Sequence, residues 1–419
     1  MKVLFCSIAF PPKSDPECLQ TAKYFYYLCK DEKLEIDVIT SSIPTLFMDE
    51  DNSLERYNTG WRKKYEIKIP ENKYINGLLR KISPFGIDFP DSKFWFHWKW
   101  KSAIKKIESI PDIIYSRSYP LSSTLLAYHL SKSYDVPWIM HLSDPWSISP
   151  LHTFNRYQYK WHIKWEKKCF EKARKICLTS ERTLDFYKEV YPEFTEKFDF
   201  FPNVYDPNEL INNPIRFDRK LRFVYTGGLI KDRSIKWFLP VFRALKNKYP
   251  YLKNDCEFVF AGNMDLMNRN LFMKHPFPFV KHIGNLSYEK ALELQKSGHI
   301  LINIDNPIDD PKKAVFFPSK LLDYFLAQRR ILCLTNDGSS SYFALKNYLA
   351  DVCENHNIPT IMKYIETALY EWKHKNKDFF RTKELPERYS AVENAARLAS
   401  LIKKYETGVA RANSGHTRA

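Results

Sequence analysis

Short apolar runs alternate along the chain with longer segments in which apolar residues recur at helical spacing. In the first half, the runs that predict buried strands are 3–9, 35–40, 112–116, 138–141 and 176–179. The segments that predict helices between them are 19–30, 121–132 and 157–174. Short strands that alternate with helices of ten or more residues are typical of a parallel sheet with right-handed crossovers. This half is therefore predicted to be a doubly wound α/β domain.

The same pattern restarts after a polar, proline-containing stretch at 206–220, which is predicted to be an exposed linker. Strands are predicted at 221–226, 257–261, 282–284, 300–304 and 331–335, and helices at 235–248, 288–297 and 320–327. We therefore expect two Rossmann-like domains, 1–205 and 221–385, with a ligand cleft between them at the carboxyl ends of their strands. A C-terminal helix at 386–406 is expected to pack back toward the first domain, and 407–419 has the composition of a disordered tail.

Composition agrees with two globular domains in a chain of 419 residues, because 44% of the residues are apolar and 27% are charged. Only 11 residues are glycine, which excludes collagen-like and glycine-repeat architectures. Eight cysteines without a CxxC pair favour reduced core thiols in a cytoplasmic protein over disulfides or a zinc site. No apolar run is long enough to predict a membrane-spanning helix, and the apolar start of the chain is interpreted as a strand rather than a signal peptide.

Several short motifs occur in an order that is specific as a set. The first half holds Phe10-Pro11-Pro12, Pro90-Asp91, Pro111-Asp112-Ile113-Ile114-Tyr115-Ser116 and His141-Leu142-Ser143-Asp144-Pro145-Trp146. The second half holds Tyr225-Thr226-Gly227-Gly228-Leu229, Arg233, Phe260-Ala261-Gly262, His282-Ile283-Gly284 and Phe317-Pro318-Ser319-Lys320-Leu321-Leu322-Asp323-Tyr324. In this order of motifs the chain resembles the GT-B glycosyltransferases of family 4, which are retaining enzymes, over nearly its whole length. The resemblance implies that the C-terminal domain binds a nucleotide-sugar donor and the N-terminal domain binds the acceptor.

The first donor-site candidates follow the opening strand of the second domain. Gly227 and Gly228 lie directly after that strand, where the absence of a side chain lets the backbone approach a ligand closely. Arg233 follows and offers a planar fork of donors suited to phosphate. Two phosphates need such backbone amides or fixed cations, because more negative charge develops on them as the glycosidic bond breaks. Gly228 stands where many relatives carry a phosphate-binding arginine, so this sequence departs from the family pattern there.

The second group of donor-site candidates opens a predicted helix. Ser319 is predicted to be its N-cap, which would leave the amides of Lys320 and Leu321 facing the cleft together with the Lys320 ammonium. Asp323 lies on the same helix face and is expected to bind the ribose hydroxyls. In family 4 this position is usually the second glutamate of a Glu-x7-Glu motif, whose first position is Val315 here. The competing interpretation is an ordinary ion pair between Lys320 and Asp323.

For the other domain, the resemblance points to His141 and Asp144 as the groups near the reaction centre. A neutral imidazole can hydrogen-bond a sugar hydroxyl, and Asp144 can orient the loop or contact donor or acceptor hydroxyls. Pro12, Lys13 and Arg117 are expected on the acceptor side. The competing interpretations are a structural histidine at position 141, and a turn at Asp144 that places the following tryptophan in the core.

In retaining enzymes of this kind the departing phosphate accepts the acceptor's proton, so no protein nucleophile, metal ion or cofactor is expected. The donor is expected to be a UDP- or GDP-sugar. The acceptor is expected to be lipid-linked or an oligosaccharide, in the assembly of a cell-surface polysaccharide such as a capsule or O-antigen. Two alternatives stay open: a sugar-nucleotide epimerase of the same architecture, and a catalytically degenerate partner protein that binds a nucleotide sugar without transfer.

The formal net charge of +16 is partly concentrated in two aromatic-rich segments of the first domain. Residues 61–110 hold 12 Lys and Arg against 5 Asp and Glu, and residues 155–175 hold 8 against 2. Lys and Arg beside Trp and Phe are typical of a surface that lies on anionic headgroups, so we expect peripheral contact with the inner face of the cell membrane. Compositional bias is the second interpretation. Nucleic-acid binding is not expected, because no nucleic-acid module is recognisable.

Overall fold

The chain folds into two compact units. The computed structural model describes residues 1–42, 48–70, 74, 89–150, 154–210, 214–308, 310, 313–346, 350–354, 356–381 and 386–405. Unit 1 holds Met1–Asp206 and the C-terminal part of the chain from Glu387, and unit 2 holds Pro207–Pro386. The predicted tail at 407–419 lies outside the described residues.

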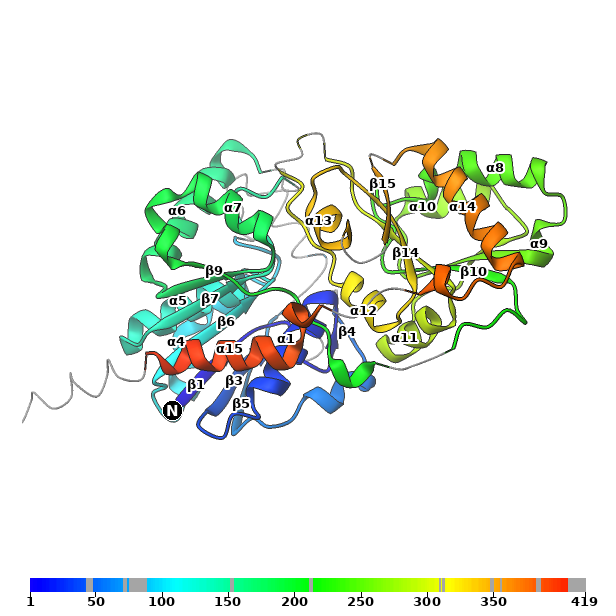
Figure 1. Ribbon diagram of the computed structural model, residues 1–419. Coiled ribbons are helices and arrows are strands. Elements are labelled where there is room, and N and C mark those ends of the chain that lie inside the picture. Colours follow the sequence, from blue (N-terminus) through cyan, green and yellow to red (C-terminus); the bar gives the residue numbers. More distant parts are fainter. Residues whose placement is uncertain are drawn as a thin grey trace, which may run out of the picture. The chain divides into compact units, whose positions relative to one another are not determined.

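Unit 1 is built on a seven-stranded parallel sheet of strand order β5-β3-β1-β6-β7-β8-β9. Its strands are β1 (Lys2–Cys6), β3 (Glu35–Ser41), β5 (Lys63–Ile67), β6 (Ile113–Ser118), β7 (Trp138–Leu142), β8 (Lys175–Leu178) and β9 (Phe198–Phe200). A short antiparallel pair, β2 (Lys13–Ser14) and β4 (Asp49–Glu50), stands apart from this sheet. The chain adds strands outward from β1 to β5 and then returns to β6, so the order of addition reverses between β1 and β6 (Figure 1).

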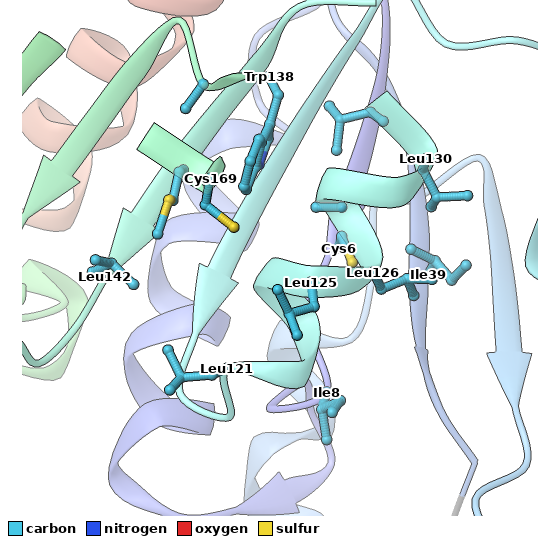
Figure 2. Close-up of a cluster of buried hydrophobic side chains, with 14 of the residues drawn as sticks. Cys6, Ile8, Ile39, Leu121, Leu125, Leu126, Leu130, Trp138, Leu142 and Cys169 are labelled. Atoms are coloured by element: carbon cyan, nitrogen blue, oxygen red, sulfur yellow. The ribbon is translucent and has the colours of Figure 1, made fainter. Parts of the chain in front are cut away.

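Helices cover both faces of this sheet. They are α1 (Pro16–Leu28), α3 (Trp95–Trp98), α4 (Trp100–Lys106), α5 (Ser122–Tyr134), α6 (Arg156–Lys172), α7 (Glu181–Val190) and α15 (Ala391–Lys403), with 3-10 turns at Asn52–Tyr57, Pro192–Lys197 and Glu387–Tyr389. Alternate residues of β1 point to opposite faces, so Phe5 packs in the core with α1 and α15, and Cys6 in the core with α5. Figure 2 shows Cys6 beside Leu125 and Leu126 of α5 in the second of these cores.

Unit 2 is built on a six-stranded parallel sheet of strand order β12-β11-β10-β13-β14-β15. Its strands are β10 (Leu221–Thr226), β11 (Cys256–Ala261), β12 (Val280–His282), β13 (Ile300–Ile304), β14 (Arg330–Thr335) and β15 (Ala350–Glu354). Its helices are α8 (Leu239–Lys248), α9 (Leu252–Asp255), α10 (Leu266–Lys274), α11 (Tyr288–Ser297), α12 (Lys320–Leu326), α13 (Ser340–Lys346) and α14 (Ile358–Lys373), with 3-10 turns at Pro207–Glu209, Ile235–Trp237 and Asp378–Phe380. Apolar residues of α8 and α14 cover one face of the sheet. The predicted doubly wound α/β fold is thus confirmed in both units.

Local differences from the prediction have physical causes. The predicted helix at 235–248 is a 3-10 turn followed by α8, because Pro240 has no amide hydrogen and stands in the first turn of α8. Helix α1 begins earlier than predicted, because Asp15 caps it by accepting from the Cys18 amide at 2.7 Å. Along the described part of the chain, no helix combines the length and the apolar composition needed to cross a bilayer.

Candidate functional site

In unit 2, the predicted donor-site residues lie at one point of the sheet. The order in which strands are added reverses between the neighbours β10 and β13, and ligands of open α/β sheets bind outside the carboxyl ends of the strands at such a point. Strand β10 ends at Thr226 and is followed by Gly227. Helix α12, which begins at Lys320, brings its first residue to the same end of the sheet, where the Lys320 side chain lies next to Gly227.

The glycine turn after β10 needs the backbone freedom that glycine provides. Gly227 has a φ of +127°, and a side chain there would meet the Lys320 Nζ at 3.8 Å. The following loop packs against it: Gly262 has a φ of +128°, and a Cβ there would lie 2.2 Å from the Gly227 carbonyl oxygen. Gly228 is half-buried, and the Leu229 amide donates to the Asn263 carbonyl at 2.8 Å, so the two loops are joined by backbone hydrogen bonds.

Lys320 carries the most unusual electrostatics of the site. Its Nζ is buried and has no hydrogen-bond partner among the described residues, and it lies 3.9 Å from the centre of the Tyr225 ring. Burial lowers the pKa of Lys320 well below its usual value, the guanidinium of Arg233 lowers it further, and the carboxylate of Asp305 acts in the opposite direction. Arg233 is half-buried, and its Nε likewise has no described partner. Two neighbouring basic side chains without described partners at this position are a candidate site for an anion.

Tyr324 holds α12 against the two central strands and was not singled out from the sequence. Its hydroxyl accepts from the Thr226 amide at 3.1 Å and donates to the Ile302 carbonyl at 2.9 Å. It therefore links the carboxyl end of β10 to β13 and sets the position of Lys320 one turn earlier. In the sequence, the only indication of its importance is that it is the last residue of the motif that runs from Phe317 to Tyr324.

Asp323, the predicted ribose ligand, is buried and faces another carboxylate. The hydroxyl of Tyr288 lies 3.1 Å from Asp323 Oδ1 and 2.7 Å from Glu209 Oε2. The i, i+3 spacing permits an ion pair between Lys320 and Asp323, but the carboxylate that acts on the pKa of Lys320 is that of Asp305, and Nζ makes no hydrogen bond in the described part of the chain. The lysine and the aspartate of this helix therefore have different environments.

Two predictions about the start of α12 need correction. Ser319 stands at the N-cap position, but its backbone is helical and its side chain makes no capping hydrogen bond. The Leu321 amide, expected to be open to a ligand, donates instead to the Pro318 carbonyl at 3.0 Å, and Leu321 itself is buried. The tight turn that begins the helix uses this amide internally, so the side chain of Lys320 remains a candidate group for an anion.

In unit 1, His141 lies inside the core at the end of β7. The Tyr115 hydroxyl lies 2.6 Å from its Nδ1, and Nη1 of Arg117 lies 3.1 Å from its Nε2. Burial and the Arg117 charge both lower the pKa of His141 well below its usual value, so the ring is neutral. The ring is enclosed by unit 1 side chains, with Tyr24 and Phe201 against it. Both ring nitrogens thus contact side chains of unit 1, and the place of His141 near a reaction centre stays a prediction.

Glu17 is a candidate site residue that the sequence analysis did not single out. It lies in the first turn of α1, and its Oε1 is 2.8 Å from Nε of the fully buried Arg117, as an ion pair without the alignment of a hydrogen bond. The Glu17 side chain remains 12% exposed. Burial raises the pKa of Glu17 to about 7, although the Arg117 charge lowers it. A carboxyl with this pKa at the end of a parallel sheet is a candidate acid or base. A glutamate after a proline-rich loop carries no motif that could have revealed it.

Asp144 lies near Glu17, whereas the other predicted acceptor-side residues are buried. Asp144 is exposed after β7, and its charge contributes to the raised pKa of Glu17. Lys13 donates from Nζ to the carbonyls of Ile8 and Ser41, at 2.9 and 2.8 Å, and to a threonine hydroxyl, so its three donors are used inside unit 1. Burial lowers the pKa of Lys13 to about 8.

Pro12 and Arg117 are likewise buried, so they support the loop and the Glu17 carboxylate from within the unit. Nη2 of Arg117 donates to Oδ1 of Asn203 at 2.9 Å. No cluster of three His, Cys, Asp or Glu side chains is placed to hold a metal ion in the part of the chain that the structure describes.

No protein-family model and no curated protein sequence matches the chain. Solved structures are similar over nearly the whole length of both chains. Sucrose-phosphate synthase from Thermosynechococcus elongatus has a TM-score of 0.65 and 11% identity, covering 97% of this chain and 100% of its own. HepE from Anabaena, in complex with UDP and glucose, has a TM-score of 0.57 and 11% identity, covering 99% of both chains. UDP-GlcNAc 2-epimerase from Neisseria meningitidis, bound to UDP-GlcNAc, has a TM-score of 0.54 and 14% identity, covering 96% and 100%. At these identities the likeness shows the fold, and that fold is GT-B.

Proposed function

We propose that this protein is a glycosyltransferase that uses a nucleotide-sugar donor, and that unit 2 binds the donor's diphosphate at Lys320 and Arg233. The observation that carries the proposal is the buried, unpartnered Nζ of Lys320 beside a second cation at the point where the strand order reverses. A buried cation without a hydrogen-bond partner is costly in the free protein, and an anionic ligand with charge-assisted hydrogen bonds offsets that cost. The HepE and epimerase structures with UDP or UDP-GlcNAc support the choice of nucleotide.

Calorimetric titration with UDP, GDP and their sugars tests the donor site. Lys320→Met and Arg233→Met are each expected to weaken nucleoside diphosphate binding by about 1 to 3 kcal/mol, the range of a charged hydrogen bond. The control is Lys246→Met, which removes the same charge from an exposed position of α8. Affinity should be the same with and without a chelator, because the phosphate charge is met by side chains. Unchanged affinity in both site variants would refute the assignment.

The chemical step is proposed to be transfer with retention of the anomeric configuration. The phosphate that leaves the donor sugar accepts the proton of the acceptor hydroxyl, so the C–O bond to the nucleotide breaks as the new glycosidic bond forms. Glu17 and Asp144 are proposed to bind acceptor hydroxyls. Incubation with a donor and candidate acceptors should release the nucleoside diphosphate only when the acceptor is present, and NMR of the product gives its anomeric configuration.

A sugar-nucleotide epimerase is the alternative enzyme class, and UDP-GlcNAc 2-epimerases are among the similar folds. Such an enzyme would convert the sugar nucleotide to its epimer without any acceptor. Chromatography of the nucleotide sugar after incubation separates the two activities. Tight donor binding without either reaction would favour a degenerate partner protein, the third possibility.

The acceptor is proposed to be lipid-linked, in cell-surface polysaccharide assembly, because unit 1 carries a belt of aromatic rings covered by lysines. The rings are Trp98, Trp100, His129, Trp161 and Trp165. Trp100 stacks on His129 at 5.2 Å, and His129 contacts Trp165 at 6.0 Å. Trp98 and Trp161 are 51% and 46% exposed. Exposed tryptophan beside lysine is typical of an interface with anionic lipid.

Lysines of the same helices lie over these rings and complete the belt. Lys164 lies 5.4 Å from the Trp161 ring and Lys168 lies 4.7 Å from the Trp165 ring. Co-sedimentation with phosphatidylglycerol vesicles is expected, with little binding to phosphatidylcholine vesicles and a loss of binding at high salt. The double variant Trp161→Ala, Lys164→Ala should bind less, and the control Tyr251→Ala, Lys246→Ala in unit 2 should not. Equal binding to both vesicle types would contradict the proposed contact between these lysines and anionic lipid.

A further inference from the structure

A second basic feature of unit 2 lies at the opposite edge of its sheet, at the amino ends of the strands. Strands β13 and β14 begin at Ile300 and Arg330, and the residues just before them line a cavity of about 250 Å³. Residues of the segment 214–219, which leads into β10, also line the cavity. The charged side chains of the lining are Arg216, Arg219, Lys296, Arg329 and Glu293. The lining therefore holds four basic side chains and one carboxylate. The cavity lies at the amino ends of the strands, whereas Lys320 lies at their carboxyl ends.

The floor of this cavity is held rigidly by backbone hydrogen bonds. Arg329 donates from Nε to the Gly298 carbonyl at 2.9 Å and from Nη2 to the Lys296 carbonyl at 3.0 Å. Burial, together with the charge of Arg381, lowers the pKa of Arg329 to about 10. A guanidinium retained in this environment keeps the local potential positive at neutral pH.

His299 fixes the wall of the cavity to the sheet. Its Nδ1 accepts from the Arg222 amide at 3.0 Å, so the proton is on Nε2, which donates to the Arg216 carbonyl at 2.6 Å. Burial and the nearby charges of Arg329 and Arg222 lower the pKa of His299, which keeps the ring neutral. The backbone at Arg216 is thereby positioned before any ligand arrives.

We propose that this cavity binds a small phosphate monoester or a dianion of similar size. The guanidinium groups of Arg216 and Arg219 are exposed and make no hydrogen bond or ion pair with any residue that the structure describes, so their planar forks of donors are open to a phosphate. The volume is below the roughly 300 Å³ at which ligand pockets usually begin, which fits a phosphate on a single small group and not a nucleotide sugar. The ligand would join segment 214–219 to the amino ends of β13 and β14.

Isothermal titration of the full-length Lys320→Met variant with glucose 6-phosphate tests this proposal, because the substitution disables the proposed donor site first. One binding event per chain is expected, with glucose itself failing to bind. Adding Arg216→Ala and Arg219→Ala should weaken binding by about tenfold or more, the effect of losing charged hydrogen bonds. The matched control adds Arg243→Ala and Lys246→Ala, which remove two exposed charges from α8.

The outcomes separate this cavity from the donor site and from general charge attraction. Retained affinity in the control, with folding of both variants verified by circular dichroism, supports the proposal. No binding, equal binding of glucose, or an equal loss in the control overturns it. Failure of the donor-site assignment changes none of these results, since Lys320 is absent throughout.

Discussion

The ammonium of Lys320 lies 3.9 Å from the centre of the Tyr225 ring and 6.0 Å from that of the Tyr324 ring, and its Nζ makes no hydrogen bond in the described part of the chain. A cation over an aromatic face gains about 2 kcal/mol when desolvated, which is less than the cost of burying an unpaired charge. The residue is therefore expected to lower the stability of the free protein and to raise its affinity for an anion. A residue in a ligand site can thus lower stability while it raises affinity, whereas a residue in a structural ion pair is not expected to raise affinity for a ligand.

Replacement of Lys320 by methionine should stabilise the free protein by about 1 to 3 kcal/mol while it weakens nucleotide binding. The methionine keeps most of the apolar length of the side chain and removes the buried charge. Urea unfolding followed by fluorescence measures the change, with Lys246→Met expected within about 0.5 kcal/mol of the parent. A destabilised Lys320→Met variant would mean that the ammonium has a structural partner.

The same lysine predicts a pH dependence of stability. Its pKa is lowered in the folded state, so between that lowered pKa and the usual lysine value the unfolded chain binds more protons than the folded chain. The unfolding free energy must then rise with pH through this window. Unfolding midpoints of parent and Lys320→Met at pH 7 and 9.5 should converge as the pH rises. A constant difference would contradict the lowered pKa.

Tyr324→Phe should lower the unfolding free energy by about 1 to 3 kcal/mol, because the Thr226 amide and the Ile302 carbonyl lose their shared buried partner. Nucleotide affinity should fall as well, since α12 carries Lys320. Tyr251→Phe is the control, because Tyr251 is 75% exposed. A variant with full stability and full affinity would show that the tyrosine hydroxyl positions nothing.

The two glycine loops of unit 2 should differ in their tolerance of alanine. Gly262→Ala combines a left-handed backbone, which costs about 1 to 3 kcal/mol, with a Cβ that would lie 2.2 Å from the Gly227 oxygen. Gly284→Ala has a φ of +76° but open space for the new Cβ, so only about 1 kcal/mol is expected. Thermal unfolding of both variants measures the difference. Similar losses would mean that the loops do not pack as described.

Glu17 should make the protein less stable as the pH rises. Its pKa is raised to about 7, so between about 4.5 and 7 the folded chain binds more protons than the unfolded chain and the unfolding free energy falls. Glu17→Gln mimics the neutral carboxyl and should match the parent at pH 5, then become relatively more stable by pH 8. Glu257→Gln serves as the contrast.

The pKa of Glu257 is lowered by Arg222 and Lys281, although burial acts against them. The parent should therefore lose stability relative to Glu257→Gln as the pH falls, which is the opposite slope. If the unfolding free energies of the two variants changed with pH in the same way relative to the parent, the opposite pKa shifts of Glu17 and Glu257 would be contradicted.

The central strands were predictable from the sequence, because strands buried on both faces leave continuous apolar runs such as Val3 to Cys6. The outer strands were not. Lys63–Ile67, Phe198–Phe200 and Ala350–Glu354 lie at the edges of their sheets and carry charged residues, so their pattern resembles that of a loop. Pro240 indicates the start of α8 in the sequence as well, because proline is favoured in the first turn of a helix.

The sequence by itself determined the doubly wound α/β architecture, the repeat of that pattern in two halves and the position of the glycine turn at 227, because hydrophobic period and turn residues act locally. Only the tertiary structure decided which charged side chains are satisfied. Lys13 has its three donors used and Lys320 has none used, although both are lysines near strand ends. Burial and hydrogen bonding depend on segments far apart in the chain, such as Glu17 and Arg117, and no local pattern encodes that meeting.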